Sequence, residues 1–489
     1  MFELNRMESV VLRLKALAAS TLLAAALLGA CAAAPLPPGT WDARAAPSVE
    51  VMRDGDRWSV DYVFHRAAPV WAFMDSALMA DGRQPWRPTQ WTLETPGVVM
   101  ERRGHYDVIR SVDGGPVPSR VRFSIRPKGV ELEAEYGALT FSDGAVALPT
   151  RQFDVFALPS VAAAEVMPAD LNGVDLEGGP SAVTWRDTAG PVLFNGERRA
   201  TLTTTTERSY VLLGQARVTP SEGLTTVIDP NLPPWIGEEI RSFAPRIDDY
   251  YLRRLGPPGA GSEASTVMVS WNGPTARLSS MGGSVLPGLI VMKFEGVGVL
   301  NPSQEVLERS RWFIGHESAH FWLGQAVRYQ FARDAWITEG GADLMAVRGF
   351  KALDPAYDAR AELQTEVDDC IDLSRNKPVA EAGERGEHRA YYACGAVFAM
   401  AAEGAQKRRD GGDWFDFLRP VLAANREDGV LTRAEWLDAL TRVSGDPSLA
   451  ATIERMLDQG AADPGAEIAA LFRKTGVPHR VENGKVTLL

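Results

Sequence analysis

Hydrophobic spacing divides the chain into two regions. Between residues 47 and 214, apolar and polar positions alternate mostly with a period of two, which is typical of strands that bury one face. Residues 120–126 and 130–135 alternate throughout, and turn signals such as Asp54-Gly55 separate the runs. We therefore expect an N-terminal domain of antiparallel β-sheets over residues 47–219.

The spacing changes to that of helices after residue 220. A helical run over residues 235–255 contains Pro245, which predicts a kink or a break into two shorter helices. Two strand-like runs follow, and beyond Pro302 the pattern is helical almost to the end. The order predicts an α+β fold, with a mixed α/β domain over residues 220–425 and a short C-terminal helical region over residues 426–489.

Composition narrows the class of protein. The 489 residues are 45% hydrophobic and 23% charged, which excludes wholesale disorder and a polytopic membrane protein. Lys and Arg number 51 against 63 Asp and Glu, and this net charge of −12 argues against nucleic acid as a partner. No pattern in the sequence indicates an oligomeric state.

The N-terminus predicts export. Residues 1–30 combine basic residues with an apolar run too short to span a bilayer comfortably, as in a signal peptide. The run ends in Leu-Gly-Ala-Cys31, which resembles the lipobox of bacterial lipoproteins and implies lipidation of Cys31, with residues 31–46 as a linker. Cleavage after Ala34 or an uncleaved anchor are alternatives. All three export the chain, and the lipobox implies a lipid anchor in the membrane of the cell envelope, with the chain facing the periplasm.

Lipidation of Cys31 would leave Cys370 and Cys394 as the remaining thiols. An exported pair can form a disulfide because the compartment is oxidising. Two buried, unpaired cysteines on helices are the alternative, and the sequence does not decide between them.

A candidate metal site begins at His316-Glu317-Ser-Ala-His320. Two histidines four residues apart lie on one face of a helix and can reach a single ion, with Glu317 close enough to contact a water on it. The surrounding residues 309–323 have helical periodicity and no proline. A helix that carries two histidines by chance is the alternative.

A third ligand is expected on a second helix. A catalytic zinc site has three protein ligands and an open position, and Glu339 follows His320 after a gap of 18 residues. Asp343 lies one turn beyond Glu339, where it could accept the Nδ1–H of a ligating histidine. A surface position for Asp343 is the alternative.

The two segments together resemble the M1 family of gluzincin metallopeptidases, which includes many aminopeptidases and leukotriene A4 hydrolase. The family pattern HExxHxWFGN corresponds to residues 316–325, and WxNEG corresponds to Trp-Ile-Thr-Glu339-Gly. The resemblance implies a thermolysin-like fold for residues 220–425 and one zinc ion on His316, His320 and Glu339. It also implies Glu317 as the general base and, in a Y-x-x-G element, Tyr392 as the transition-state tyrosine.

The chain departs from the family in the strand that binds a substrate's amino terminus. Gly283, Ser284 and Val285 correspond to part of the family's GAMEN segment, and Val285 stands where the amine-binding Glu belongs. A valine cannot pair with an ammonium group, which counts against aminopeptidase specificity. Glu295 is a possible substitute carboxylate.

The sequence therefore predicts an exported enzyme that hydrolyses peptide or protein substrates with zinc. The alternative is a peptide- or protein-binding lipoprotein that keeps the fold and the zinc with little or no turnover.

Overall fold

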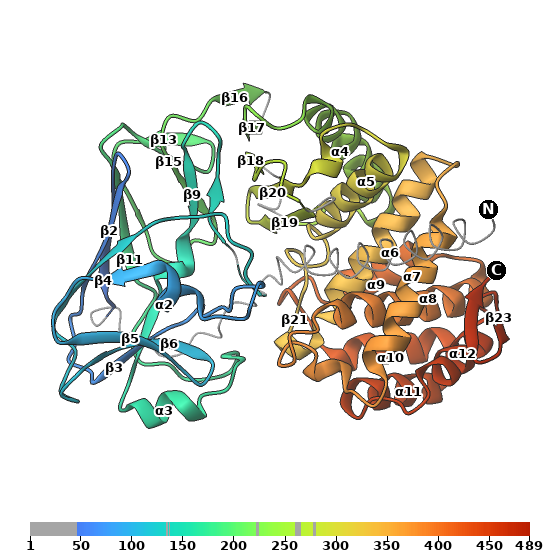
Figure 1. The fold of residues 1–489 in the computed structure, drawn as a ribbon. Helices are drawn as coiled ribbons and strands as arrows, with labels where there is room; N and C mark the ends of the chain where they lie inside the picture. Colours follow the sequence, from blue (N-terminus) through green and yellow to red (C-terminus); the bar gives the residue numbers. More distant parts are fainter. Residues whose placement is uncertain (1–45, 134, 136, 222–223, 260–265, 277–279) are drawn as a thin grey trace, which may run out of the picture.

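Figure 1 shows the computed structural model, which describes residues 46–489 except 134, 136, 222–223, 260–265 and 277–279. A β-rich region occupies one side, helices occupy the other, and a mixed sheet lies between them (Figure 1). The predicted α+β fold, with β-sheets first and helices last, is confirmed. The predicted signal peptide, Cys31 and the linker up to residue 45 lie outside the described residues.

Three sheets build the β-rich region, with strand orders β14-β11-β1-β2-β7-β4, β10-β3-β6-β5 and β13-β12-β15-β9-β8. Burial alternates along β2 and β7, as the period of two predicts. The strands are β1 (Ser48–Asp54), β2 (Arg57–Val63), β3 (Val70–Phe73), β4 (Trp91–Leu93), β5 (Val98–Arg103), β6 (Tyr106–Ser111), β7 (Arg120–Ile125), β8 (Leu139–Thr140), β9 (Val146–Pro149), β10 (Val155–Leu158), β11 (Ala182–Asp187), β12 (Val192–Phe194), β13 (Glu197–Arg199), β14 (Leu202–Thr204) and β15 (Tyr210–Leu213). Two short helices accompany them, α2 (Trp86–Gln90) and α3 (Val161–Val166).

The alternating run over residues 130–135 does not form the strand that its pattern predicts. Within the part of it that the structure describes, Leu132 makes a single bridge to Met79. The chain folds back here, since a Cβ on Gly137 would lie 2.8 Å from the carbonyl oxygen of Val130. Glu133 pairs with Arg83 at 2.9 Å. The alternating pattern therefore does not produce a strand here, because the backbone at Gly137 packs closely against Val130.

A mixed five-stranded sheet follows, in the order β16-β17-β18-β20-β19. Its strands are β16 (Val218–Ser221), β17 (Leu224–Ile228), β18 (Thr266–Trp271), β19 (Ser280–Leu286) and β20 (Leu289–Glu295). Strands β17, β18 and β20 are parallel, whereas β19 runs antiparallel to β20 at the edge of the sheet. The first strand of this sheet begins two residues before the expected boundary at residue 220.

Helices form the rest of the chain, with two small strand pairs. They are α4 (Pro234–Leu255), α5 (Gln304–Ala319), α6 (Trp336–Leu353), α7 (Ala359–Ser374), α8 (Arg389–Asp410), α9 (Trp414–Ala424), α10 (Arg433–Ser444), α11 (Pro447–Asp458) and α12 (Pro464–Thr475). The strand pairs are β21 (Arg328–Tyr329) with β22 (Val430–Leu431), and β23 (His479–Glu482) with β24 (Lys485–Leu488).

Of the kink or break predicted at Pro245, the break is wrong. Helix α4 continues through this proline without interruption. Its buried face, which includes Phe243, Ile247 and Tyr251, belongs to the large core that α5 and α6 also build. Burial of these side chains on both sides of Pro245 offsets the hydrogen bond that the proline cannot make.

One apolar core runs through the mixed sheet and all the large helices, from Leu232 to Leu488. The C-terminal helices α10 to α12 share this core. A separate apolar cluster joins the β-rich region to the mixed sheet, where Leu193 and Leu212 pack with Met268 and Val291. This buried apolar contact stabilises the packing of the two parts of the chain against each other.

Two glycines allow α6 and α8 to cross closely. A Cβ on Gly340 would lie 2.1 Å from the carbonyl carbon of Gly395, and a Cβ on Gly395 would lie 2.2 Å from the carbonyl oxygen of Trp336. No side chain fits at such distances. These are the glycines of the WITEG and Tyr-x-x-Gly segments, so their role in the fold is to bring the backbones of the two helices together.

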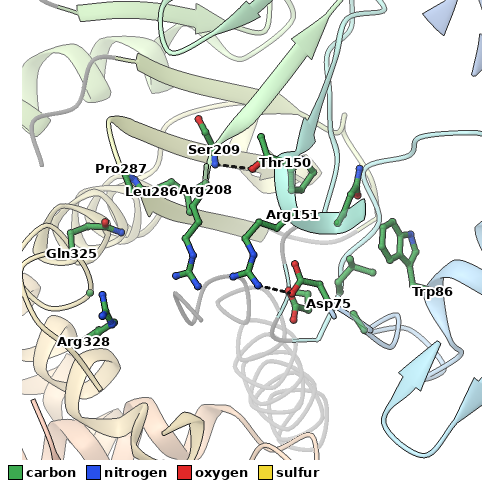
Figure 2. Close-up of a pocket in the computed structure, with 16 residues that line it drawn as sticks. Asp75, Trp86, Thr150, Arg151, Arg208, Ser209, Leu286, Pro287, Gln325 and Arg328 are labelled. Carbon is green, nitrogen blue, oxygen red and sulfur yellow. Dashed lines mark hydrogen bonds and ion pairs between the residues drawn. The ribbon is translucent and has the colours of Figure 1, made fainter. Parts of the chain in front are cut away.

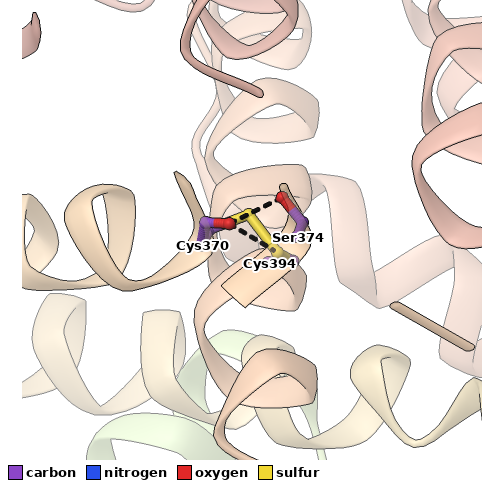
Figure 3. Close-up of a disulfide and its surroundings, with 3 residues drawn as sticks. All are labelled: Cys370, Ser374 and Cys394. Atoms are coloured by element: carbon purple, nitrogen blue, oxygen red, sulfur yellow. Dashed lines mark hydrogen bonds between the residues drawn. A yellow bond between two sulfur atoms is a disulfide. The ribbon is translucent and has the colours of Figure 1, made fainter. Parts of the chain in front are cut away.

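A disulfide joins α7 and α8, between Cys370 and Cys394, which decides the question that the sequence left open (Figure 3). The two cysteines are separated by 24 positions. Closing a loop of that size stabilises a fold by about 3.5 kcal/mol in the chain-entropy account. No helix within the described residues combines the length and the apolar character needed to cross a membrane.

Candidate metal centre

Helix α5 carries the two histidines at its C-terminal end. The side chain of Ser303 caps the start of the helix by accepting a hydrogen bond from the backbone N–H of Val306 at 3.3 Å. The helix ends at Ala319, earlier than the periodicity over residues 309–323 indicates, and His320 keeps a helical backbone as the C-cap. The spacing of one turn between His316 and His320 is therefore preserved.

Three side-chain atoms face a common point. The Nε2 atoms of His316 and His320 lie 3.0 Å apart, and Oε2 of Glu339 lies 3.6 Å and 3.5 Å from them. Zinc bonds of 2.0–2.1 Å in a tetrahedral arrangement place neighbouring ligand atoms about 3.3 Å apart. The predicted ligand set has the spacing that such an ion requires, and all three residues are buried.

The ring orientations leave both Nε2 atoms as acceptors. Nδ1 of His320 lies 2.8 Å from the carbonyl oxygen of Leu323, which can only accept, so Nδ1 carries the hydrogen. Nδ1 of His316 lies 2.7 Å from Oδ1 of Asp343, in the contact that the sequence predicts. In neutral rings the two Nε2 lone pairs then face each other and the Glu339 carboxylate. A cation fits this donor set, and Oε2 of Glu339 makes no hydrogen bond to any residue that the structure describes.

Electrostatics favour positive charge at the same point. Burial alone would lower the pKa of His316 and of His320. The carboxylates of Asp343 and Glu339 nevertheless raise the pKa of His316 above its usual range, and the carboxylate of Glu339 does the same for His320. Burial would raise the pKa of Glu339, but the two histidines lower it to about 2. The residues therefore create a buried site that attracts a cation.

Asp343 belongs to a longer chain of charges that the sequence analysis missed. Its Oδ2 lies 3.7 Å from Nη1 of Arg389, and Arg389 donates hydrogen bonds to Glu366 at 2.7 Å and to Asp369 at 2.9 Å. Arg389 lies on α8 three residues before Tyr392, and its partners lie on α7. The spacing of Arg389 and Tyr392 on one helical face was a usable signal, but the partners depend on tertiary packing.

Glu317 lies beside the three-atom cluster without being part of it. Its carboxylate packs against β19, because a Cβ on Gly283 would lie 2.8 Å from Cδ of Glu317. Oε2 of Glu317 is buried and makes no hydrogen bond within the described part of the chain. Burial and the neighbouring Glu339 raise the pKa of Glu317 to about 7, against the opposing effect of the histidines.

Tyr392 reaches the cluster from α8. Its ring stacks on that of His316, with the centroids 5.7 Å apart and an angle of 23° between the planes. The hydroxyl of Tyr391, by contrast, donates to the carbonyl oxygen of Ala380 at 3.0 Å and accepts from the backbone N–H of Gly383 at 3.1 Å. The structure therefore brings Tyr392 to the site and gives Tyr391 a structural role.

The segment with Gly283, Ser284 and Val285 lies in edge strand β19, next to α5. Val285 is buried and lines a small cavity together with His320 and Glu339. Glu295 pairs across the ladder with Ser280, five positions and about 17 Å along the strand from Val285. Glu295 therefore cannot supply the carboxylate that Val285 lacks.

No protein-family model matches this chain, and no curated protein matches it. The chain is similar to the solved structure of a mutant M1 zinc metallopeptidase from Deinococcus radiodurans bound to a Tyr-Ser-Ala substrate. The TM-score is 0.46 and the identity 14%, over 85% of this chain and 93% of that one.

It is also similar to a mutant of a two-domain M1 zinc metallopeptidase bound to L-tryptophan. There the TM-score is 0.44 and the identity 15%, over 85% of this chain and 94% of that one. For native yeast LTA4 hydrolase the values are 0.47 and 13%, over 86% and 68%. At such low TM-scores and identities, these similarities do not show which reaction this chain performs. Its chemistry is inferred from its own side chains.

Replacing Asp343 with Asn should weaken zinc binding about tenfold to 100-fold, because the neutral amide supports the His316 imidazole less well than the carboxylate does. Competition with a chelating dye measures the affinity. Asp438→Asn on the exposed face of α10 is the matched control and should bind zinc as the wild type does. Unchanged affinity in Asp343→Asn would show that the contact does not support the metal.

Proposed function

We propose that this protein is a zinc-dependent peptidase. The observation that carries the proposal is the position of Glu317, a buried carboxylate whose Oε2 makes no hydrogen bond in the described chain, beside a cluster of three ligand atoms. Three protein ligands leave a coordination position open, which is the arrangement of catalytic rather than structural zinc sites. A protein that used the zinc for structure alone would have no need of a free carboxylate there.

His316 and His320 would hold the ion through Nε2, and Glu339 through Oε2. Bound there, zinc would polarise a peptide carbonyl and make a water molecule more acidic. Glu317 would accept the proton of the attacking water on its carboxylate and pass it to the nitrogen of the leaving amine. The packing of Gly283 supports this role. Because glycine has no side chain, the Glu317 carboxylate fits against β19, and Gly283 offers it no side-chain hydrogen bond.

Tyr392 would donate a hydrogen bond from its hydroxyl to the oxygen that gains negative charge in the transition state. Its stacking on His316 supports this role, since the ring is held next to a proposed ligand. Removing a donor of this kind typically raises the barrier by about 3 kcal/mol.

The peptide substrate would lie along β19, whose outer edge has no neighbouring strand among the described residues. One acceptor on this strand is already used, because Nε2 of Gln325 donates to the carbonyl oxygen of Val285 at 2.8 Å. The apolar Val285 at the cluster supports cleavage that does not require a free amino terminus.

Glu317→Gln should keep its zinc and lose about 100-fold to 10,000-fold in kcat, because the amide cannot take up the proton. Elemental analysis measures the zinc, and hydrolysis of free and N-blocked peptides measures turnover. A chelator should abolish wild-type cleavage, and added zinc should restore it. A zinc-loaded wild type that cleaves no peptide would contradict the proposal and favour the binding-protein alternative.

Gly283→Ala should lower kcat about tenfold to 100-fold while zinc occupancy stays full, because the new methyl group displaces the Glu317 carboxylate. The control is the same substitution in the Glu317→Gln protein, where it should cause little further loss. Equal losses in the two backgrounds would mean that Gly283 does not act through Glu317.

We also propose that the protein is exported and anchored in the cell envelope through a lipid on Cys31. The disulfide between Cys370 and Cys394 supports export, because such bonds persist in oxidising compartments. Cys31→Ala should abolish incorporation of labelled fatty acid and release the protein from the membrane fraction. Unchanged membrane association of this variant would favour an uncleaved anchor instead.

A further inference from the structure

A cavity of about 150 Å³ lies where the β-rich region meets the mixed sheet (Figure 2). One wall comes from the β-rich region, with Arg151 and Arg208. The other comes from the turn between β19 and β20 and from the segment after α5, which includes Gly324 and Arg328. A volume of this size corresponds to about five water molecules, so it suits a single side chain or chain terminus.

Three arginines converge on this cavity (Figure 2). Arg151 is already paired, since it lies 3.9 Å from Asp75 and 3.5 Å from Asp154. Arg208 interacts electrostatically with Glu135, a buried carboxyl whose pKa is raised by burial and by the nearby Asp75. These carboxyls therefore offset part of the positive charge on the β-rich wall.

Arg328 is different. It is half-buried on the opposite wall, and its Nε is buried without a hydrogen-bond partner among the residues described. Burial lowers the pKa of Arg328, with Asp428 as the opposing attraction. Figure 2 shows its side chain across the cavity from those of Arg208 and Arg151. A guanidinium in this position is stabilised by an anion that enters the cavity.

The cavity borders on the metal centre. Gly324 and Arg328 also line the small cavity that contains His320, Glu339 and Val285. A Cβ on Gly324 would lie 3.6 Å from Nδ1 of His320, so the wall of the larger cavity is in contact with a proposed ligand. A peptide whose amide lies at the metal centre can therefore place a neighbouring group in the cavity.

We propose that this cavity binds a carboxylate of the peptide substrate, so that the enzyme selects acidic groups near the scissile bond. The inference rests on the proposed peptidase function. Arg328 supplies the planar pair of donors that a carboxylate accepts. Because Val285 cannot pair with the amino terminus of a substrate, another charged group of the substrate has to position it, and a carboxylate can do so. The carboxylate comes either from an Asp or Glu side chain or from the C-terminus of the peptide.

Matched peptides test the proposal with the full-length, zinc-loaded protein. One set exchanges Glu for Gln at each position around the scissile bond, and another exchanges a C-terminal acid for an amide. The acidic member of one set should have a kcat/KM about tenfold to 100-fold higher, mainly through KM. The set that shows the difference identifies the source of the carboxylate.

Arg328→Gln should bring the ratio of the two kcat/KM values close to one. Arg208→Gln should lower the same ratio, and serves as a second variant if Arg328→Gln folds poorly. Arg480→Gln, on the exposed C-terminal hairpin, is the matched control and should keep the wild-type ratio. Equal cleavage of both members of every pair by the wild type would overturn the proposal, as would an unchanged ratio in Arg328→Gln.

Calorimetric binding separates this proposal from the peptidase function. The zinc-loaded Glu317→Gln protein should bind the acidic peptide about tenfold to 100-fold more tightly than its neutral partner. Tighter binding of the acidic peptide without any wild-type turnover would defeat the peptidase function and keep the carboxylate site. Wild-type turnover with equal cleavage and equal binding of the acidic and neutral peptides would keep the peptidase function and defeat the carboxylate site.

Discussion

Two imidazole nitrogens and one carboxylate oxygen face one another at about bonding distance from a common point, inside the protein. Such an arrangement is unfavourable unless a cation occupies the point, because the lone pairs repel and burial removes the water that would screen them. The surrounding structure supplies the constraint that keeps them together. Helix α5 provides both imidazoles one turn apart, and α6 provides the carboxylate.

The constraint extends outward in layers. Glycines at the crossing of α6 and α8 bring Tyr392 up to the His316 ring, and Arg389 on the same helix faces the carboxylate that orients that ring. Helix α7 supplies the acids that pair with Arg389, and the disulfide fastens α7 to α8. Each layer limits the movement of the one inside it, so a substitution two contacts away can alter the geometry at the centre.

The sequence predicted what depends on spacing within one element. The pair at i and i+4 placed His316 and His320 on one face, and Asp343 one turn beyond Glu339 reached the ring as expected. The helical run over residues 235–255 was also right, but the break at Pro245 was wrong because burial on both sides of the proline decides the outcome. The strand predicted over residues 130–135 failed for a similar reason, since the return of the chain at Gly137 is invisible in an alternating pattern.

Contacts between distant elements lay beyond the sequence. Nothing in the pattern around Gly283 indicates that it packs on Glu317, and nothing around Arg328 indicates that it faces Arg208. These contacts depend on how the β-rich region and the helices are placed against each other, which the apolar cluster between them determines. The pairing of Cys370 with Cys394 likewise required the positions of α7 and α8.

The arginine-lined cavity takes one wall from the β-rich region, whereas the metal cluster is built entirely on α5 and α6. Substitutions on the strands and turns of the N-terminal half can thus alter the shape and charge of the cavity without disturbing the ligand atoms. Under the two proposals, part of the selectivity would reside on the N-terminal half, whereas bond cleavage and Arg328 belong to the helical half, so evolution or an engineer could adjust the first part while leaving the ligand atoms intact.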